Sequence, residues 1–241
     1  MMTSGADAHG ALPEPEEAEA LFGDALPVVR HYVDLLAHTG VERGLIGPRE
    51  VPRLWDRHVM NCAVVEELIP KGAEVIDVGS GAGLPGIVLS ILRPDLSVVL
   101  LEPLLRRTVF LRECLGELQL PNASVRRGRA EEVKEELRAD IVTARAVAPL
   151  TRLTGWALPL LRKNGSLLAL KGEQAAAELE SARGDLLKQR PCVADVIRVG
   201  QGKVDPATTV VRVTVTSESG LATQPGSKRG QGGRKKRGRK R

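Results

Sequence analysis

The residues with the clearest chemical signal lie in one glycine-rich turn. The sequence VIDVGSGAGLPG spans residues 75–86 and places Gly79, Gly81 and Gly83 between a short apolar run and a predicted helix. Glycine adopts positive φ angles and lets a ligand approach the main chain without a Cβ clash. The first turn of the following helix offers unpaired N–H groups to a polar ligand. The turn therefore predicts a binding site for a nucleotide-like molecule.

An acidic residue follows where a ribose would need one. The next apolar run, residues 97–102, ends in Glu102, which lies 19 residues after Gly83. An acid at the end of the second strand of such a unit accepts hydrogen bonds from the ribose hydroxyls. The turn and Glu102 together predict an adenosine site at the carboxyl edge of a sheet.

Two cofactor classes fit this site. Residues 81–86 read Gly-Ala-Gly-Leu-Pro-Gly and also satisfy the dinucleotide pattern GxGxxG. S-adenosylmethionine is favoured because Asp77 lies two residues before the first glycine, where a carboxylate can meet the methionyl amino group or its water shell. About 70 residues precede the turn, whereas a dehydrogenase pattern usually begins near the start of the chain. We therefore expect S-adenosylmethionine as the cofactor.

Strand and helix patterns alternate around the turn, which indicates βαβ units and a mostly parallel sheet with helices on both faces. The pattern TVVRVTVT at 209–216 alternates and is typical of an edge or antiparallel strand. The predicted class is α/β, with a seven-stranded, Rossmann-like sheet. Its strands are expected at 75–78, 97–102, 123–126, 140–144, 166–170, 193–199 and 209–216, and its helices at 84–92, 103–118, 130–137, 150–161 and 173–188.

A helical segment precedes the sheet. Residues 14–40 repeat apolar side chains at three- and four-residue steps, and Pro27 is expected to divide them into two helices. We predict one domain over residues 14–216, with a helical cap at 14–70 and the cofactor-binding α/β core at 71–216. Residues 1–13 and 217–241 lack a core-forming pattern and are predicted to be disordered.

The charge of the chain is unevenly distributed. The sequence has 35 Lys and Arg against 30 Asp and Glu, but residues 228–241 hold nine basic residues and no acid. The first 227 residues therefore carry 26 basic and 30 acidic side chains, a formal charge of −4. The basicity belongs to the tail and predicts a polyanionic partner for it. Aromatic residues make up only 2%, which argues against recognition by stacked aromatic side chains.

The sequence gives no signal for a metal, a membrane or secretion. Cys62, Cys114 and Cys192 lie in apolar runs without metal-ligand spacing. The acidic N-terminal segment has no apolar stretch of signal-peptide type, and no run approaches 18 apolar residues. We expect a cytoplasmic monomer without a metal.

Five segments occur in an order that resembles the bacterial ribosomal RNA small subunit methyltransferase G family, also called glucose-inhibited division protein B. The similarity covers roughly residues 20–215. It implies the class I methyltransferase fold and S-adenosylmethionine-dependent methylation of N7 of one guanine in the 16S rRNA of the small ribosomal subunit. The segments are LWDRHVMNCAVV at 54–65, the long run DVGSGAGLPG to TVFLRE at 77–113, RAEE at 129–132, TARAVAPL at 143–150 and LLALKG at 167–172.

The resemblance also implies which residues form the site. Gly79 and Leu84 would contact the cofactor from the glycine loop, Ala130 and Glu131 would flank the adenine, and Arg145 would complete the site. The asparagine-containing loop that is usual in the family is replaced by VERGLIGPREV at 41–51. The basic tail lies outside the matched region.

Guanine N7 carries a lone pair and no proton, so its methylation needs no general base. Catalysis then depends on positioning and desolvation of the reactants, which lower the activation barrier by about 7–11 kcal/mol. The residues after the fourth strand read ARAVAPL, without the Asn-Pro-Pro-Tyr motif of amine-directed methyltransferases. We expect Arg145 to be the catalytic residue, orienting guanine O6 or a phosphate. His58 is expected to be a partly buried, hydrogen-bonded residue and not a base.

Basic residues near the carboxyl ends of the strands predict a rim that binds the phosphates of 16S rRNA. Three other functions remain open: methylation of another RNA or a small molecule, nucleotide-dependent RNA binding without catalysis, and nicotinamide-dependent oxidoreduction. Product formation separates catalysis from binding, and titration with S-adenosylhomocysteine and NAD separates the two cofactor classes. The predicted rim residues are Arg106, Arg107, Arg129 and Lys171.

Overall fold

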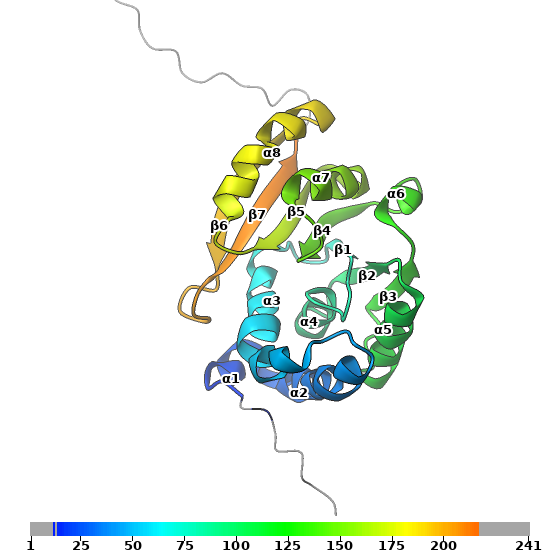
Figure 1. The fold of residues 1–241 in the computed structure, drawn as a ribbon, viewed down its shortest axis with the longest axis vertical. Helices are drawn as coiled ribbons and strands as arrows, with labels where there is room; N and C mark the ends of the chain where they lie inside the picture. Colours follow the sequence, from blue (N-terminus) through cyan, green and yellow to red (C-terminus); the bar gives the residue numbers. More distant parts are fainter. Residues whose placement is uncertain (1–11, 13, 217–241) are drawn as a thin grey trace, which may run out of the picture.

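One seven-stranded sheet runs through the protein, which we describe over residues 12 and 14–216 in a computed structural model (Figure 1). The strand order is β3-β2-β1-β4-β5-β7-β6, and β7 alone runs antiparallel to its neighbours β5 and β6. The predicted seven-stranded, mostly parallel sheet is therefore confirmed. The strands are β1 (Glu74–Val78), β2 (Ser97–Glu102), β3 (Ala123–Arg127), β4 (Ala139–Arg145), β5 (Leu161–Lys171), β6 (Cys192–Val199) and β7 (Thr208–Val215).

Helices cover both faces of the sheet, and neighbouring strand residues point to opposite faces. Val75 and its partner Ile141 pack with the cap helices, whereas Ile76 and its partner Val142 pack with α7 and α8. The register thus keeps apolar side chains on both faces, as a buried parallel sheet requires. The helices that follow the strands are α4 (Gly86–Leu92), α5 (Leu105–Glu117), α6 (Ala130–Val133), α7 (Leu150–Ala157) and α8 (Ala175–Gln189).

Several predicted boundaries move in the structure, and the helix expected over 130–137 ends at Val133. The helix expected over 150–161 ends at Ala157, and β5 begins at Leu161, five residues before the predicted strand. Asn164 adopts a positive φ of 64°, and the pairing between β4 and β5 shifts between Ala139 and Ile141. This irregularity lets the chain bulge and stay in the sheet, which the apolar pattern alone does not predict.

The cap consists of short helical turns that pack against one face of the sheet (Figure 1). The first break lies at Gly23, where φ is +47°, and not at Pro27, as the sequence predicted. Pro27 instead occupies the first turn of α2, where its missing N–H would have had no helical partner. The elements are α1 (Glu17–Phe22), η1 (Gly23–Ala25), α2 (Leu26–Leu35), η2 (Leu36–Gly40), η3 (Pro48–Arg53), η4 (Leu54–Met60), α3 (Asn61–Ala63) and η5 (Val64–Leu68).

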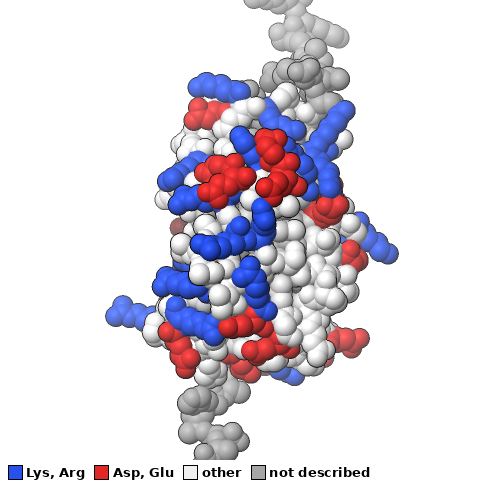
Figure 2. All heavy atoms as spheres, turned by 90° about the vertical axis from the view of Figure 1, so that its right-hand side faces the viewer, with Lys and Arg blue, Asp and Glu red and all other residues white. Residues whose placement is uncertain are grey.

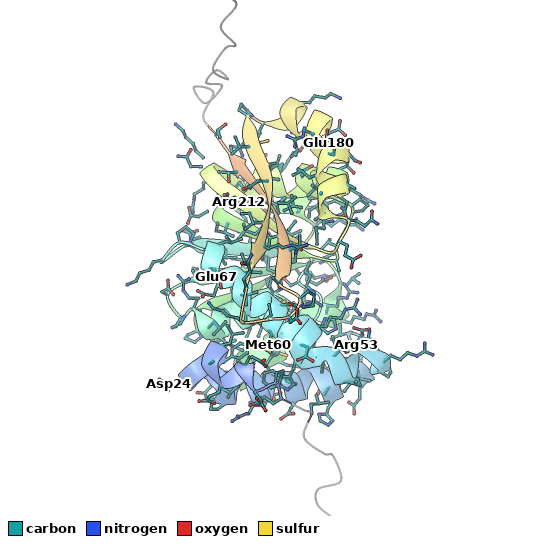
Figure 3. All side chains as sticks on the ribbon, turned by 90° about the vertical axis from the view of Figure 1, so that its left-hand side faces the viewer. Asp24, Arg53, Met60, Glu67, Glu180 and Arg212 are labelled. Carbon is teal, nitrogen blue, oxygen red and sulfur yellow. The ribbon has the colours of Figure 1, made fainter. Side chains whose placement is uncertain are left out.

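Polar contacts join the cap to both ends of the sheet domain. The Tyr32 hydroxyl is buried and donates to the main-chain oxygen of Ala82 in the glycine-rich turn at 2.8 Å. Figure 3 shows Glu67 beside the loop between β6 and β7, where its carboxylate accepts from Nζ of Lys203 at 2.9 Å. The cap is thus connected to the glycine-rich turn and to the far edge of the sheet.

The predictions of disorder for residues 1–13 and 217–241 fall outside the described residues, apart from Leu12. Within the described part of the chain, no helix is long and apolar enough to cross a membrane.

Candidate functional site

The glycine-rich turn connects β1 to α4 and takes the left-handed backbone that its sequence predicts. Gly79, Gly81 and Gly83 have φ angles of +69°, +59° and +102°. The N–H of Gly79 donates to the main-chain oxygen of Leu101 on β2 at 2.8 Å. A Cβ on Gly79 would lie 2.9 Å from a methyl group of Val147, so this position also needs glycine for space. The turn is held close to the ends of β2 and β4.

Glu102 ends β2 and faces the glycine-rich turn. One carboxylate oxygen accepts from the N–H of Gly81 at 3.0 Å, and the other accepts from the N–H of Leu104 at 3.0 Å. Nη1 of Arg107 lies 3.6 Å from the same carboxylate, which is only 1% exposed. Each oxygen accepts one main-chain hydrogen bond and keeps capacity for a second. Glu102 is therefore held rigidly where a ribose is expected.

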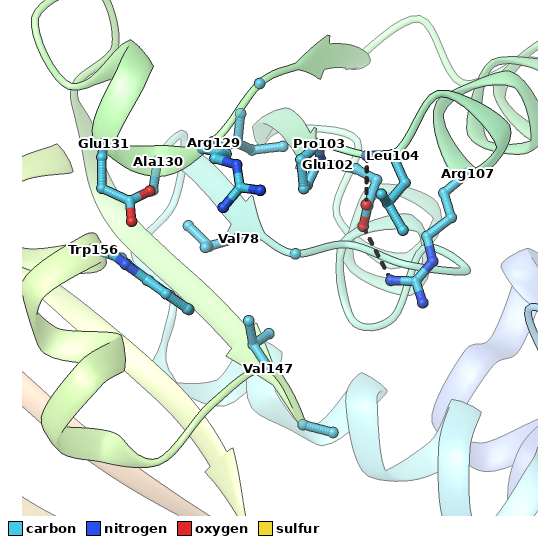
Figure 4. A pocket seen from close by; sticks show the side chains of 14 residues that line it. Val78, Glu102, Pro103, Leu104, Arg107, Arg129, Ala130, Glu131, Val147 and Trp156 are labelled. Atoms are coloured by element: carbon cyan, nitrogen blue, oxygen red, sulfur yellow. Dashed lines mark hydrogen bonds and ion pairs between the residues drawn. The ribbon is translucent and has the colours of Figure 1, made fainter.

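A cavity of about 450 Å³ opens at the carboxyl ends of β1, β2 and β4 (Figure 4). It contains four of the predicted cofactor residues, namely Gly79, Glu102, Ala130 and Glu131. The carboxyl edge of a parallel sheet is where such folds bind ligands. The whole lining is Val78, Gly79, Leu101, Glu102, Pro103, Leu104, Arg107, Gly128, Arg129, Ala130, Glu131, Ala146, Val147 and Trp156.

The cavity also contains residues that the sequence did not single out. Trp156 on α7 lies across from Glu131 in Figure 4. The guanidinium carbon of Arg152 lies over the Trp156 ring, 4.9 Å from its centroid. Val147 packs on the turn from the β4–α7 loop. No local sequence pattern marked Trp156, which is the next-to-last residue of α7 and reaches the cavity through the packing of that helix.

One buried polar atom in this wall has no partner. Nε of Arg107 is the single buried side-chain nitrogen or oxygen without a hydrogen bond among the described residues. Buried donors are nearly always paired, so an unpaired one at a cavity wall suits a ligand with an acceptor group. The carboxylate of Glu102, the glycine main chain and this unpaired donor together fit a nucleoside-containing cofactor.

Asp77 has a different position from the one expected. Its carboxylate is completely buried, does not line the cavity, and accepts from the Thr143 hydroxyl at 2.9 Å and the N–H of Gly86 at 3.2 Å. Burial raises the pKa of Asp77 to about 6, although these hydrogen bonds and the charge of Arg145 oppose the shift. Asp77 therefore joins β1 to β4 and to the first residue of α4.

Arg145 lies at the end of β4 and points toward the cap. Its Nη1 lies 3.3 Å from the main-chain oxygen of His58 and 3.5 Å from Sγ of Cys62, and its Nη2 contacts Nδ1 of His58. Nε2 of His58 contacts the Glu50 carboxylate at 2.8 Å. Burial and the charge of Arg145 lower the pKa of His58, so the ring is neutral near pH 7. As expected, His58 is a buried, hydrogen-bonded residue.

Three of the predicted cofactor residues do not line the cavity: Gly81, Leu84 and Arg145. Gly81 contributes through its bond to Glu102, and the Leu84 side chain packs in the core beneath the cap. Among the predicted rim residues, Arg107 and Arg129 line the cavity.

The two other predicted rim residues differ sharply from each other. The side chain of Arg106 is exposed and forms no hydrogen bond or ion pair within the described chain. Lys171 is already engaged, because its ammonium donates to the main-chain oxygen of Ala148 at 2.9 Å and to Glu178 at 2.7 Å. Glu178 also accepts from the N–H of Leu150 at 2.9 Å. Lys171 and Glu178 thus hold both ends of the segment 148–150.

Metal ligands are not grouped in the described part of the chain, where no cluster of three or more His, Cys, Asp or Glu side chains could hold an ion.

The chain resembles solved structures in its fold. A Corynebacterium glutamicum protein has a TM-score of 0.53 at 16% identity, covering 78% of this chain and 91% of that one. The ribosomal protein L11 methylase of Lactobacillus delbrueckii subsp. bulgaricus has a TM-score of 0.50 at 15% identity, covering 66% and 78%. The sheet order and these likenesses identify the class I methyltransferase fold.

Curated relatives are far more similar in sequence. The ribosomal RNA small subunit methyltransferase G of Thermobifida fusca is 74% identical over 229 residues, which cover 94% of this chain and 97% of the relative. The protein of the same name in Streptomyces avermitilis is 56% identical over 209 residues, covering 86% and 88%. The family model for rRNA small subunit methyltransferase G matches residues 26–203. The chain therefore belongs to the rRNA small subunit methyltransferase G family.

Proposed function

We propose that this chain transfers a methyl group from S-adenosylmethionine to N7 of a guanine in the 16S rRNA of the small ribosomal subunit. Membership of the family carries the activity: the protein is an rRNA methyltransferase of the small subunit. The observation that carries the cofactor is the cavity at the carboxyl edge of the sheet, in which Glu102 faces the glycine-rich turn. When bound there, S-adenosylmethionine supplies an electrophilic methyl group on its sulfonium.

The residues of the cavity have distinct tasks in this proposal. Glu102 binds the ribose hydroxyls with the capacity left on its two oxygens, and the main chain at Gly79 and Gly81 allows the ligand to approach closely. Ala130 and Glu131, at the start of α6, flank the adenine. Leu84 contributes from the end of the turn, beneath the cap.

We assign Arg145 and the basic rim to contacts with the RNA. Arg145 uses Nη1 and one hydrogen of Nη2 in its contacts with the cap, which leaves Nε–H and a second Nη2–H to orient guanine O6 or a phosphate. Arg106, Arg107 and Arg129 bind phosphates around the cavity mouth. The engaged ammonium of Lys171 supports a role in holding the loop before α7 more strongly than the predicted contact with RNA.

No residue needs to remove a proton from guanine N7, so catalysis consists of orientation and exclusion of water. The surroundings of His58 agree with this, because both ring nitrogens already have protein partners. We place the reaction in the cytoplasm and expect a monomer to act on the small subunit or its 16S rRNA.

The decisive experiment incubates the chain with labelled S-adenosylmethionine and small subunits from cells that lack the protein, followed by nucleoside mass spectrometry. We expect 7-methylguanosine, and a methylated adenine or cytosine would overturn the proposal. Calorimetry provides the cofactor control, with binding expected for S-adenosylhomocysteine and none for NAD.

A further inference from the structure

Three large apolar side chains are exposed beside the mouth of the cavity. The exposed fractions of Leu104, Leu105 and Val109 are 46%, 54% and 39%. Only two other large apolar residues in the described chain are similarly exposed, Val193 and Val196, and they lie on β6 at the opposite edge of the sheet. Leu105 and Val109 are one helical turn apart on α5, and Leu104 also lines the cavity. We call Leu104, Leu105 and Val109 the apolar strip.

Arginines surround the apolar strip. Arg106 lies within it in sequence and has no partner in the described chain, while Arg107 and Arg129 line the adjoining cavity. Figure 2 faces the side where α5 and β3 lie and shows Lys and Arg side chains in a band down the molecule, with groups of Asp and Glu in its upper and lower parts and uncharged surface beside it. A partner for this face must therefore offer anionic groups together with flat apolar surfaces.

Single-stranded RNA has this combination, because its phosphates are anionic and the faces of its unstacked bases are apolar. A duplex does not, because neighbouring bases cover those faces. An A-form duplex also hides guanine N7 in a deep, narrow major groove that side chains cannot reach. Because Leu104 belongs to both the apolar strip and the cavity wall, an RNA that approaches the cavity from the α5 side meets the strip.

We infer that the apolar strip receives an unstacked base next to the target guanine, while Arg106 binds the neighbouring phosphate. The inference rests on the proposed function and specifies the form of its substrate: the guanine is presented from an unpaired segment. Binding at the strip is tolerant of base identity, because every base has a face that can pack on Leu105 and Val109.

Paired serine substitutions test the strip. The variant carries Leu105→Ser and Val109→Ser, and the matched control carries Val193→Ser and Val196→Ser, whose exposed fractions are 59% and 39%. Fluorescence anisotropy measures binding to a 12-nucleotide single strand and to the corresponding duplex. We expect the strip variant to lose roughly tenfold in affinity for the single strand and nothing for the duplex. The control variant should bind both RNAs as the unaltered chain does.

Salt dependence separates apolar contacts from ionic ones. The strip variant should keep the slope of log affinity against log salt, because an apolar contact releases no counterions. Arg106→Gln should flatten that slope and weaken both RNAs. Affinity for S-adenosylhomocysteine should stay unchanged in both, which shows that the pocket remains folded.

Three outcomes would overturn the inference. Unchanged single-strand affinity would exclude the strip from the RNA site, and equal losses for single strand and duplex would exclude a base contact. A raised KM on small subunits with unchanged oligonucleotide binding would instead assign the strip to a ribosomal protein. Failure of the proposed function is a separate result, because it appears as missing 7-methylguanosine with the unaltered chain.

Discussion

Nη1 of Arg145 donates to the main-chain oxygen of His58 at 3.3 Å, which connects the end of β4 to the helical cap. The same guanidinium contacts Nδ1 of the His58 ring, so Nδ1 accepts and Nε2 carries the proton that is donated to Glu50. The cap therefore fixes the direction of the side chain to which we assign the target guanine.

Replacing Arg145 tests this assignment. Arg145→Ala should lower turnover roughly 10- to 100-fold, the range expected for losing a hydrogen bond from a charged group. The free energy of unfolding should fall by only about 1 kcal/mol, because the side chain is partly exposed. Steady-state methylation and urea unfolding measure the two effects. Glu50→Gln, which leaves the guanidinium in place, should reduce turnover less, and full activity of Arg145→Ala would remove the proposed role.

Glu102 should control cofactor affinity. Glu102→Gln keeps the shape of the side chain but loses the charge and one acceptor, and we expect a loss of about 1.5–3 kcal/mol in binding S-adenosylhomocysteine. Calorimetry measures it, with Glu135→Gln as a control because Glu135 is 81% exposed and lies outside the cavity. Equal affinities of the Glu102 variant and the control would remove Glu102 from the site.

The order of strands and helices was predictable because each element has a clear pattern of its own. Glu102 and the glycines mark the ends of β1 and β2, and topology alone brings such ends to one edge. The helix break was not predictable from Pro27, since proline is tolerated in the first turn and Gly23 supplies the positive φ. The bulge at Asn164 depends on pairing with β4, which is a non-local interaction.

Gly79 and Gly81 should respond differently to alanine. Gly81→Ala should cost about 1–2 kcal/mol in unfolding free energy from the left-handed backbone alone, because the nearest atom to its Cβ is 3.7 Å away. Gly79→Ala should cost more, because its Cβ would also press on Val147. Adding Val147→Ala should recover the excess. A double variant no more stable than Gly79→Ala would show that crowding is not the cause.

Asp77 should make stability depend on pH. Its pKa is raised from 3.8 to about 6 in the folded state, so between these values the unfolded chain ionises while the folded chain stays protonated. The protonated Asp77 side chain contributes to the free energy of unfolding at low pH, and this contribution is lost as the pH rises from about 4 to 6. Relative to the unaltered chain, Asp77→Asn should gain on the order of 3 kcal/mol across that window. Urea unfolding at several pH values measures the difference, and a constant difference would contradict the assignment.

The basic tail should act through its charge. Residues 228–241 carry nine basic residues, and each phosphate contact on a single strand contributes roughly 0.7 to the salt slope. Deleting them should raise the KM for small subunits and flatten its salt dependence, while S-adenosylhomocysteine affinity and the methylated position stay the same. The same KM and slope after deletion would show that the tail is not used. A different methylated nucleotide would show that it carries specificity.

The site was less predictable than the fold because several roles depend on side-chain direction. Asp77 and Lys171 are of residue types that bind ligands, but each is engaged inside the protein. Asp77 accepts a hydrogen bond from Thr143, and Lys171 donates one to Glu178. Trp156 reaches the cavity only because α7 packs beside it. These contacts join residues distant in sequence, and a linear pattern does not encode them.

The contacts between the cap and the sheet domain limit how this protein can be divided or recombined. Tyr32 bonds to the glycine-rich turn, His58 to Arg145, and Glu67 to Lys203 across 136 positions of sequence. A chimera that takes its cap from one relative and its sheet domain from another must keep Tyr32 and Arg145, which donate to main-chain oxygens, and must match Glu67 with Lys203. The cap and the sheet are thus joined at three places, and the shortest fragment that retains the site includes the cap.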